Sequence, residues 1–158
     1  MLGQLSEEQI EQFLEEKFVG RVGCCLNGLA YIVPISYAYI DGYIYARTFE
    51  GMKLDIMRQN SSICFQVDDI PDMSNWKSVI GWGQFEELTE RNERNKALQI
   101  LMERKLPLLS STMTKFAEDW PFITEENFDE IPGVAFRILL TEKTGRFEIN
   151  KSAYDFAV

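Results

Sequence analysis

Strand-like runs dominate the hydrophobic pattern of this chain, because apolar side chains recur at alternate positions as they do on a half-buried strand. Two boundaries between these runs carry Asn27-Gly28 and Asp41-Gly42, dipeptides that favour two-residue hairpin turns. Runs joined by such turns are expected to pair as antiparallel neighbours. The predicted strands cover residues 19–26, 29–40, 43–48, 63–67, 76–88, 134–140 and 145–149.

Helical spacing appears first near the N-terminus. The segment Ser6-Glu7-Glu8-Gln9 matches a capping box, in which a serine and a glutamine satisfy each other's backbone N–H groups. Ile10, Phe13 and Leu14 follow at intervals that place them on one helical face. These signals predict a helix over about residues 7–17.

Two further helices are expected between the strands. A short helical pattern covers residues 51–60, and Thr89 is expected to cap a charged amphipathic helix that runs to about Lys105. Residues 107–131 show a broken pattern, in which a short helix is expected only near residues 111–118. The chain therefore alternates strands with inserted helices.

Proline and glycine mark irregular positions within the strands. Pro34 cannot donate to a ladder, so it predicts an edge position or a bulge in the second strand. Gly81 and Gly83 interrupt a long strand and predict a bulge or the close approach of another backbone. Residues 68–75, which are acidic and contain a proline, are expected to form a loop.

The order of elements predicts a mainly β protein with added helices. We expect a mostly antiparallel sheet with helices inserted at its edges, which suggests a small barrel. One domain over residues 1–158 is the natural expectation for this length, with a C-terminal tail from about residue 150.

The net charge of -9 and the pI near 4.6 argue against negatively charged binding partners. Such a chain repels nucleic-acid backbones and anionic membrane surfaces. No apolar run reaches the length of a membrane helix, and the acidic N-terminus lacks the pattern of a secretory signal. We therefore expect a cytoplasmic protein that binds neither nucleic acid nor membranes.

The cysteines and the absence of histidine limit the kinds of catalytic and metal sites that this chain can form. Cys24, Cys25 and Cys64 lie in apolar runs and are interpreted as small buried hydrophobes in a reducing compartment, in preference to redox or metal roles. The absence of histidine excludes Ser-His-Asp and Cys-His catalysis and His-bearing zinc or haem sites. The carboxylates of residues 68–72 lack EF-hand spacing, so no metal site is expected.

A candidate phosphate clamp follows the third predicted strand. That strand ends in Arg47 and Thr48, and Gly51 and Lys53 come next at the start of a predicted helix. Two cations, a hydroxyl and free backbone N–H groups are the donors that a phosphate needs. Taken alone, Arg47 and Lys53 are interpreted better as solvated surface charges, since most lysines and arginines are exposed.

Three segments together make the chain resemble the pyridoxamine 5'-phosphate oxidase-like, FMN-binding split-barrel family. They are Val33-Pro34-Ile35-Ser36-Tyr37, then Tyr45-Ala46-Arg47-Thr48 with Gly51-Met52-Lys53, and Trp76-Lys77-Ser78-Val79 leading into Gly83. Each motif is weak by itself, but the ordered set is moderately specific. The branch that includes nitroimidazole-resistance proteins is the most similar.

This resemblance implies a split β-barrel that binds FMN in a groove between two subunits of a homodimer. It implies that Val33, Pro34, Ile35 and Ser36 line the flavin ring, largely through main-chain contacts. The residues implied for the phosphate and ribityl end are Ala46, Arg47, Thr48 and Lys53, with Ser78 and Val79 completing the cradle.

One departure from the family pattern concerns Arg47. The resistance branch usually carries a histidine there, so a nitroimidazole-reducing role is not expected, whereas phosphate binding is compatible with arginine. An FMN-dependent oxidoreductase that takes electrons from a reduced nicotinamide nucleotide and acts on a small organic acceptor is the first hypothesis. A non-catalytic FMN storage or sensing module is the second, and a barrel that holds haem or a deazaflavin is a third.

Overall fold

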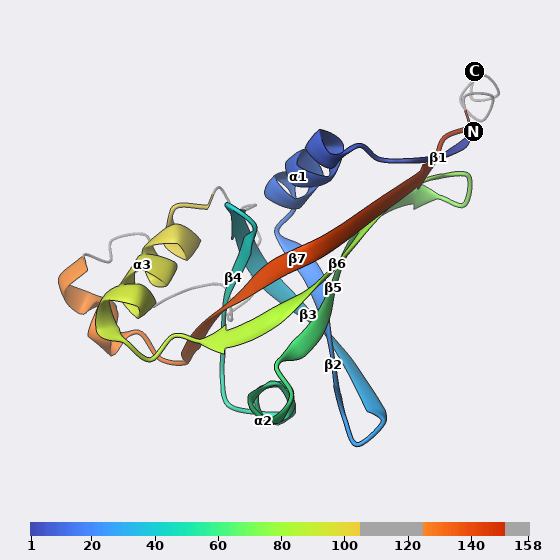
Figure 1. Ribbon diagram of the computed structural model, residues 1–158. Helices are drawn as coiled ribbons and strands as arrows, with labels where there is room; N and C mark the ends of the chain where they lie inside the picture. Colours follow the sequence, from blue (N-terminus) through green and yellow to red (C-terminus); the bar gives the residue numbers. More distant parts are fainter. Residues whose placement is uncertain (105–124, 151–158) are drawn as a thin grey trace.

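Antiparallel strands close into a ring in the computed structural model, which describes residues 1–104 and 125–150 (Figure 1). The sheet order is β1-β7-β4-β3-β2-β5-β6, and β6 pairs again with β7 and so completes the ring, while β1 is attached to the far end of β7. The predicted antiparallel split-barrel class is confirmed. The strands are β1 (Leu2–Gln4), β2 (Val19–Leu26), β3 (Leu29–Ile40), β4 (Tyr43–Thr48), β5 (Ser62–Asp72), β6 (Asn75–Glu87) and β7 (Val134–Glu148).

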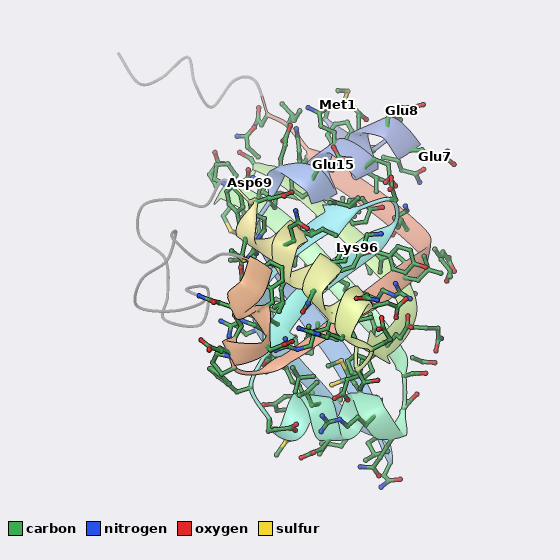
Figure 2. All side chains as sticks on the ribbon, turned by 90° about the vertical axis from the view of Figure 1, so that its left-hand side faces the viewer. Met1, Glu7, Glu8, Glu15, Asp69 and Lys96 are labelled. Carbon is green, nitrogen blue, oxygen red and sulfur yellow. The ribbon has the colours of Figure 1, made fainter. Side chains whose placement is uncertain are left out.

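Helices cover the two ends and one flank of the ring. In Figure 1, α1 (Glu7–Glu16) and α2 (Met52–Gln59) lie at opposite ends, while α3 (Arg91–Met102) and the 3-10 helix η1 (Glu125–Glu130) lie together at one side. Figure 2, turned by 90°, looks onto α3 and η1 in front of the sheet and shows Glu7, Glu8 and Glu15 on α1.

The interior of the ring forms the main hydrophobic core. Leu14 of α1 and Leu54 of α2 are fully buried there, so each helix closes its end with an apolar face. A second cluster packs α3 and η1 against the outer surface of the ring, where Tyr45 meets Leu98 and Phe128. Helix α3 therefore covers the side of β4 from which Tyr45 projects.

The local turn and cap signals are confirmed. Asn27 and Gly28 have φ of 53° and 78°, and Asp41 and Gly42 have φ of 51° and 83°, as type I′ hairpin turns require. The capping box is present as well: the Gln9 backbone N–H donates to the Ser6 hydroxyl at 3.3 Å, and the Ser6 N–H donates to the Gln9 side chain at 2.9 Å.

The predicted acidic loop over residues 68–75 is wrong. β5 continues to Asp72 and β6 starts at Asn75, so the two strands form a long hairpin with a register shift between Asp69 and Asp72. The carboxylates do not prevent pairing because cations neutralise them: Asp68 forms an ion pair with Arg21, and Asp69 forms one with Lys17.

Other boundaries also differ from the prediction. Helix α3 is capped by Glu90, whose carboxylate accepts from the N–H groups of Asn92 and Glu93, and not by Thr89. The two late strands are one strand, β7, because residues 142–144 pair with β6 and Thr141 is the extra residue of a bulge in β7. The expected helix near residues 111–118 lies outside the described residues.

The glycines of β6 have the role that the sequence predicts. The register between β6 and β7 shifts between Trp82 and Gly83, where Thr141 of β7 is the extra residue, and the predicted close approach of another backbone is found at Gly83. A Cβ atom on Gly83 would lie 2.0 Å from the Leu139 carbonyl oxygen, and one on Gly81 would lie 2.8 Å from Leu140 Cδ1. The absence of a side chain at Gly81 and Gly83 therefore lets β7 lie close against β6.

Candidate functional site

An opening in the ring separates β3 from β4. The two strands pair from Ile40↔Tyr43 to Tyr37↔Ala46, and the pairing stops there. Among the described strands, residues 29–36 of β3 then pair only with β2, whereas β4 continues along β7. We call this opening the fork; it begins where Ser36 of β3 and Arg47 of β4 would be the next pair. The edge position predicted for Pro34 is confirmed.

The four residues expected to line a flavin ring form one side of the fork. Val33 and Ile35 pack into the interior core, so only their backbone groups are available at the strand edge. Pro34 is exposed on the outer face, and the Ser36 hydroxyl accepts a hydrogen bond from the Arg104 guanidinium at 2.8 Å. This placement is compatible with main-chain contacts to a flat ligand, which is how the resemblance assigns these residues.

Arg47 projects from β4 toward α3 and η1. Its Nη1 donates to the Pro132 carbonyl oxygen at 2.6 Å, and its guanidinium lies 5.7 Å from the centre of the Phe49 ring. Burial lowers the pKa of Arg47, and the neighbouring Arg94 lowers this pKa further. Arg47 is therefore not the solvated surface charge that composition alone favoured, although it also anchors the segment around Pro132.

Lys53 lies on the first turn of α2. Gly51 precedes this helix and supplies no side-chain cap, so nothing but backbone occupies the N-cap position. Burial lowers the pKa of Lys53, and the nearby Cys24 thiol of β2 raises it. Lys53 thus lies on the side of α2 near Cys24 of β2, whereas Arg47 lies beside Pro132. The grip of both cations on one phosphate stays a prediction.

Ala46 and Thr48 turn their side chains into the ring. Ala46 is fully buried in the core, and Thr48 is 3% exposed with its hydroxyl donating to the Phe49 carbonyl oxygen at 3.3 Å. In this arrangement their backbone atoms, and not their side chains, face the fork. Sequence alternation places Arg47 on the opposite face from both of them.

Ser78 and Val79 lie far from the fork in the same chain. The register runs from Pro34 to Arg21, then to Gln66 and then to Ile80, which is three strand spacings, or about 14 Å along the sheet. Ser78 accepts from the Gln66 side chain at 3.3 Å, and Val79 is buried in the core. One chain does not bring these residues next to Val33–Ser36.

Two arginines that the sequence analysis did not select lie beside the site. Arg94 of α3 donates to the carbonyl oxygens of Phe128 at 3.0 Å and Ile131 at 2.7 Å. Arg104, just after α3, reaches across to Ser36 and Tyr37 of β3. No sequence signal marked either residue, because their proximity to the fork depends on how α3 packs against the ring.

An apolar row crosses the outer face of four strands. Ile32, Gly23, Cys64 and Trp82 are successive register partners on β3, β2, β5 and β6, and we call them the outer row. Ile32 is 67% exposed and Trp82 is 40% exposed. A hollow of about 500 Å³ lies over this row, because Gly23 leaves the space between its neighbours unfilled. Such a surface is typical of a contact region.

The side chains considered for other roles are placed as follows. Cys24, Cys25 and Cys64 are free thiols, and burial raises the pKa of Cys24 and of Cys64, which reduces their thiolate character. Within residues 1–104 and 125–150, no group of three acidic or cysteine side chains is arranged to hold a metal ion. None of the helices in the described part of the chain is long and apolar enough to span a membrane.

Comparisons with known proteins agree on one family. The model of a family described as pyridoxamine 5'-phosphate oxidase matches residues 6–146. The structure of an FAD-binding protein from Mesorhizobium loti matches with a TM-score of 0.70 and 29% identity, covering 95% of this chain and 98% of that one. A candidate 5-nitroimidazole antibiotic resistance protein from Bacteroides thetaiotaomicron shares the fold, with a TM-score of 0.69 and 17% identity over 93% and 87% of the two chains.

A relative found by sequence covers less of the chain. An uncharacterized protein of Rhizobium meliloti (strain 1021) is 32% identical over 84 residues, which are 53% of this chain and 56% of that protein. The matched segment thus spans little more than half the length of this relative.

Proposed function

The chain belongs to the pyridoxamine 5'-phosphate oxidase family, and from this premise we propose that it is an FMN-binding oxidoreductase. In this proposal it passes electrons from a reduced nicotinamide nucleotide to a small organic acceptor. The observation that carries the proposal is the fork. It combines an open strand edge at Val33–Ser36 with a partly buried cation, Arg47, in a chain whose net charge is -9.

The fork fits a flavin by the chemistry of its groups. A strand edge offers backbone N–H and C=O groups to the polar rim of a flat ring, and arginine binds phosphate bidentately. Lys53 and the N-terminus of α2, which Gly51 leaves open, add further attraction for an anion.

The residues of this chain would bind and orient the cofactor without donating or accepting protons. When bound, FMN itself supplies hydride and single-electron transfer. Val33–Ser36 would hold the ring edge, and Arg47 and Lys53 would hold the phosphate. The absence of histidine is therefore compatible with oxidoreductase chemistry. Because Arg47 stands where the resistance branch usually carries histidine, we do not extend the proposal to nitroimidazole reduction.

Visible spectroscopy tests the cofactor and the turnover separately. We expect purified protein to be yellow with flavin bands, and anaerobic NADH or NADPH to bleach these bands within seconds to minutes. An added quinone or other small acceptor should then restore the absorbance. A flavin that stays oxidised would favour the storage or sensing module, and a protein that neither retains nor binds flavin would contradict the proposal. Chromatography of the released flavin distinguishes FMN from FAD.

We also propose a homodimer with the flavin at the subunit interface. The exposed outer row supplies an apolar contact surface on β3, the strand that also forms the fork edge. Ser78 is about 14 Å along the sheet from Pro34 within one chain. If Ser78 and Val79 complete the cradle, as the resemblance implies, a second copy must supply them. Free thiols suit the cytoplasm, where we place this dimer.

Ile32→Glu is expected to convert the dimer to a monomer and to weaken flavin binding at least about tenfold. A carboxylate at the centre of an apolar interface costs several kcal/mol, but the side chain is exposed in the single chain, so the fold should tolerate it. Light scattering after gel filtration and flavin titration provide the measurements. Met73→Glu, a 93% exposed position at the β5–β6 turn, is the control. Equal masses for wild type and Ile32→Glu would refute this interface.

A further inference from the structure

Arg104 is held at the start of the fork by three oxygen atoms. It follows the C-cap residue Glu103 of α3, and its side chain turns back toward the sheet. Nε donates to the Leu101 carbonyl oxygen at 2.9 Å, while Nη1 donates at 2.8 Å to both the Ser36 hydroxyl and the Tyr37 carbonyl oxygen. The guanidinium is therefore fixed in position against β3.

The Arg104 guanidinium lies at the end of the fork where Arg47 leaves the paired part of β4. Tyr37 and Ala46 form the last pair before the fork, so Ser36 and Arg47 are the first residues on its two sides. Arg104 binds Ser36 and therefore reaches this point. Burial, together with the positive charge of Arg47, lowers the pKa of Arg104 to about 10.

The partners of Arg104 accept hydrogen bonds from Nε and Nη1 but do not neutralise its charge. All three are neutral oxygens, and among residues 1–104 and 125–150 no carboxylate forms an ion pair with Arg104. Carboxylates are plentiful, since the chain has 25 acidic and 16 basic residues. Six cations of the described chain form ion pairs, namely Lys17, Arg21, Arg58, Arg91, Arg137 and Lys143, and Arg104 is not among them.

We propose that Arg104 binds, together with Arg47, the phosphate group of the flavin held in the fork. This inference rests on the proposed function and adds a residue from the end of α3 to the cofactor site. A phosphate dianion would gain charge-assisted hydrogen bonds from both guanidinium groups. The bond to Ser36 orients the Arg104 guanidinium before the ligand arrives, which reduces the entropic cost of binding.

A purely structural role makes a different prediction. A cation that donates to the last carbonyl groups of a helix stabilises its C-terminus, and Arg104 also ties α3 to β3. Loss of such a clamp would affect ligands with and without a phosphate group equally. Riboflavin, which is FMN without the phosphate, therefore separates the two roles.

The test compares the dissociation constants of FMN and riboflavin for flavin-free wild type and Arg104→Gln. Glutamine retains a hydrogen-bond donor for Ser36 but removes the charge. We expect FMN affinity to fall by about tenfold to a hundredfold and riboflavin affinity to change by less than about twofold. Arg91→Gln, which removes an exposed α3 cation paired with Asp129, should leave both constants unchanged.

The outcomes are distinguishable. Unchanged FMN affinity in Arg104→Gln, or an equal loss for FMN and riboflavin, would overturn the role of Arg104 while leaving flavin binding intact. A wild type that binds neither ligand would overturn the proposed function, and this inference with it. If Arg104→Gln melts below the assay temperature, Arg104→Lys replaces it. Lysine keeps the charge but lacks the two parallel N–H donors of a guanidinium, so it should lose part of the preference for FMN. An unchanged ratio of the FMN and riboflavin dissociation constants would refute the proposal.

Discussion

Replacing Arg47 and Lys53 together by alanine is expected to produce a colourless protein that no longer retains flavin. Each side chain is expected to make a charge-assisted contact with the phosphate, and such a contact contributes about 1.5–3 kcal/mol. Loss of both should weaken FMN binding on the order of a hundredfold to ten-thousandfold. Flavin content after purification, followed by titration of the apoprotein with FMN, measures this loss.

The control variant must remove two positive charges elsewhere. Arg91→Ala combined with Lys96→Ala does so on the exposed side of α3, where Figure 2 labels Lys96. This variant should keep wild-type flavin content. Because Arg47 also donates to the Pro132 carbonyl oxygen, the thermal midpoint of each single variant must be followed alongside affinity. If the double variant bound FMN as tightly as wild type, the assignment of the phosphate to Arg47 and Lys53 would be wrong, although the fold would still be right.

Gly83→Ala is expected to cause a larger loss of stability than alanine at any other glycine of this sheet, because its Cβ would meet backbone atoms at the shortest distance. A Cβ atom there would lie 2.0 Å from the carbonyl oxygen and 2.8 Å from the carbonyl carbon of Leu139, and both belong to the β7 backbone. Relief of the clash requires the strands to separate at the bulge where the ring closes. We expect the free energy of unfolding to fall by about 3 kcal/mol or more and the melting temperature by about 6–12 °C.

Urea denaturation followed by circular dichroism measures this change. Gly51→Ala is the matched control, since nothing lies within 4 Å of its Cβ position and its φ of 163° is ordinary extended backbone. Its effect should stay within about 1 kcal/mol, the typical difference between residues at an N-cap. Comparable unfolding curves for Gly83→Ala and wild type would show that β7 can shift away from Gly83 at little cost.

Several elements could be predicted because their signals lie within a few residues of one another. The hairpins were predicted from Asn27-Gly28 and Asp41-Gly42, and the start of α1 was predicted from the pair Ser6 and Gln9. The bulge at Gly83 was also predictable, since a glycine inside a long strand usually marks a bulge or a close backbone approach. These features depend on backbone conformations that particular residues favour over others.

The wrong predictions lie where segments far apart in the sequence determine the local structure. The acidic run at Asp68 and Asp69 was interpreted as a loop, but Arg21 and Lys17 neutralise it from other elements. β7 was divided into two strands because its middle is polar, yet pairing with β6 continues on both sides of the bulge. Glu90 and not Thr89 caps α3, although N-cap propensity favours threonine, because the Glu90 carboxylate reaches the N–H groups of Asn92 and Glu93.

The sequence by itself indicated antiparallel strands, their tight turns and the family. It also selected Arg47 and Lys53 as candidate cations, since residue type and local spacing carry that information. Only the tertiary structure decided where β3 and β4 part, which strands separate Ser78 from Pro34, and that Arg104 reaches Ser36. The reason is physical: ring closure and helix packing bring together residues far apart in the chain, and no local preference encodes which of them will meet.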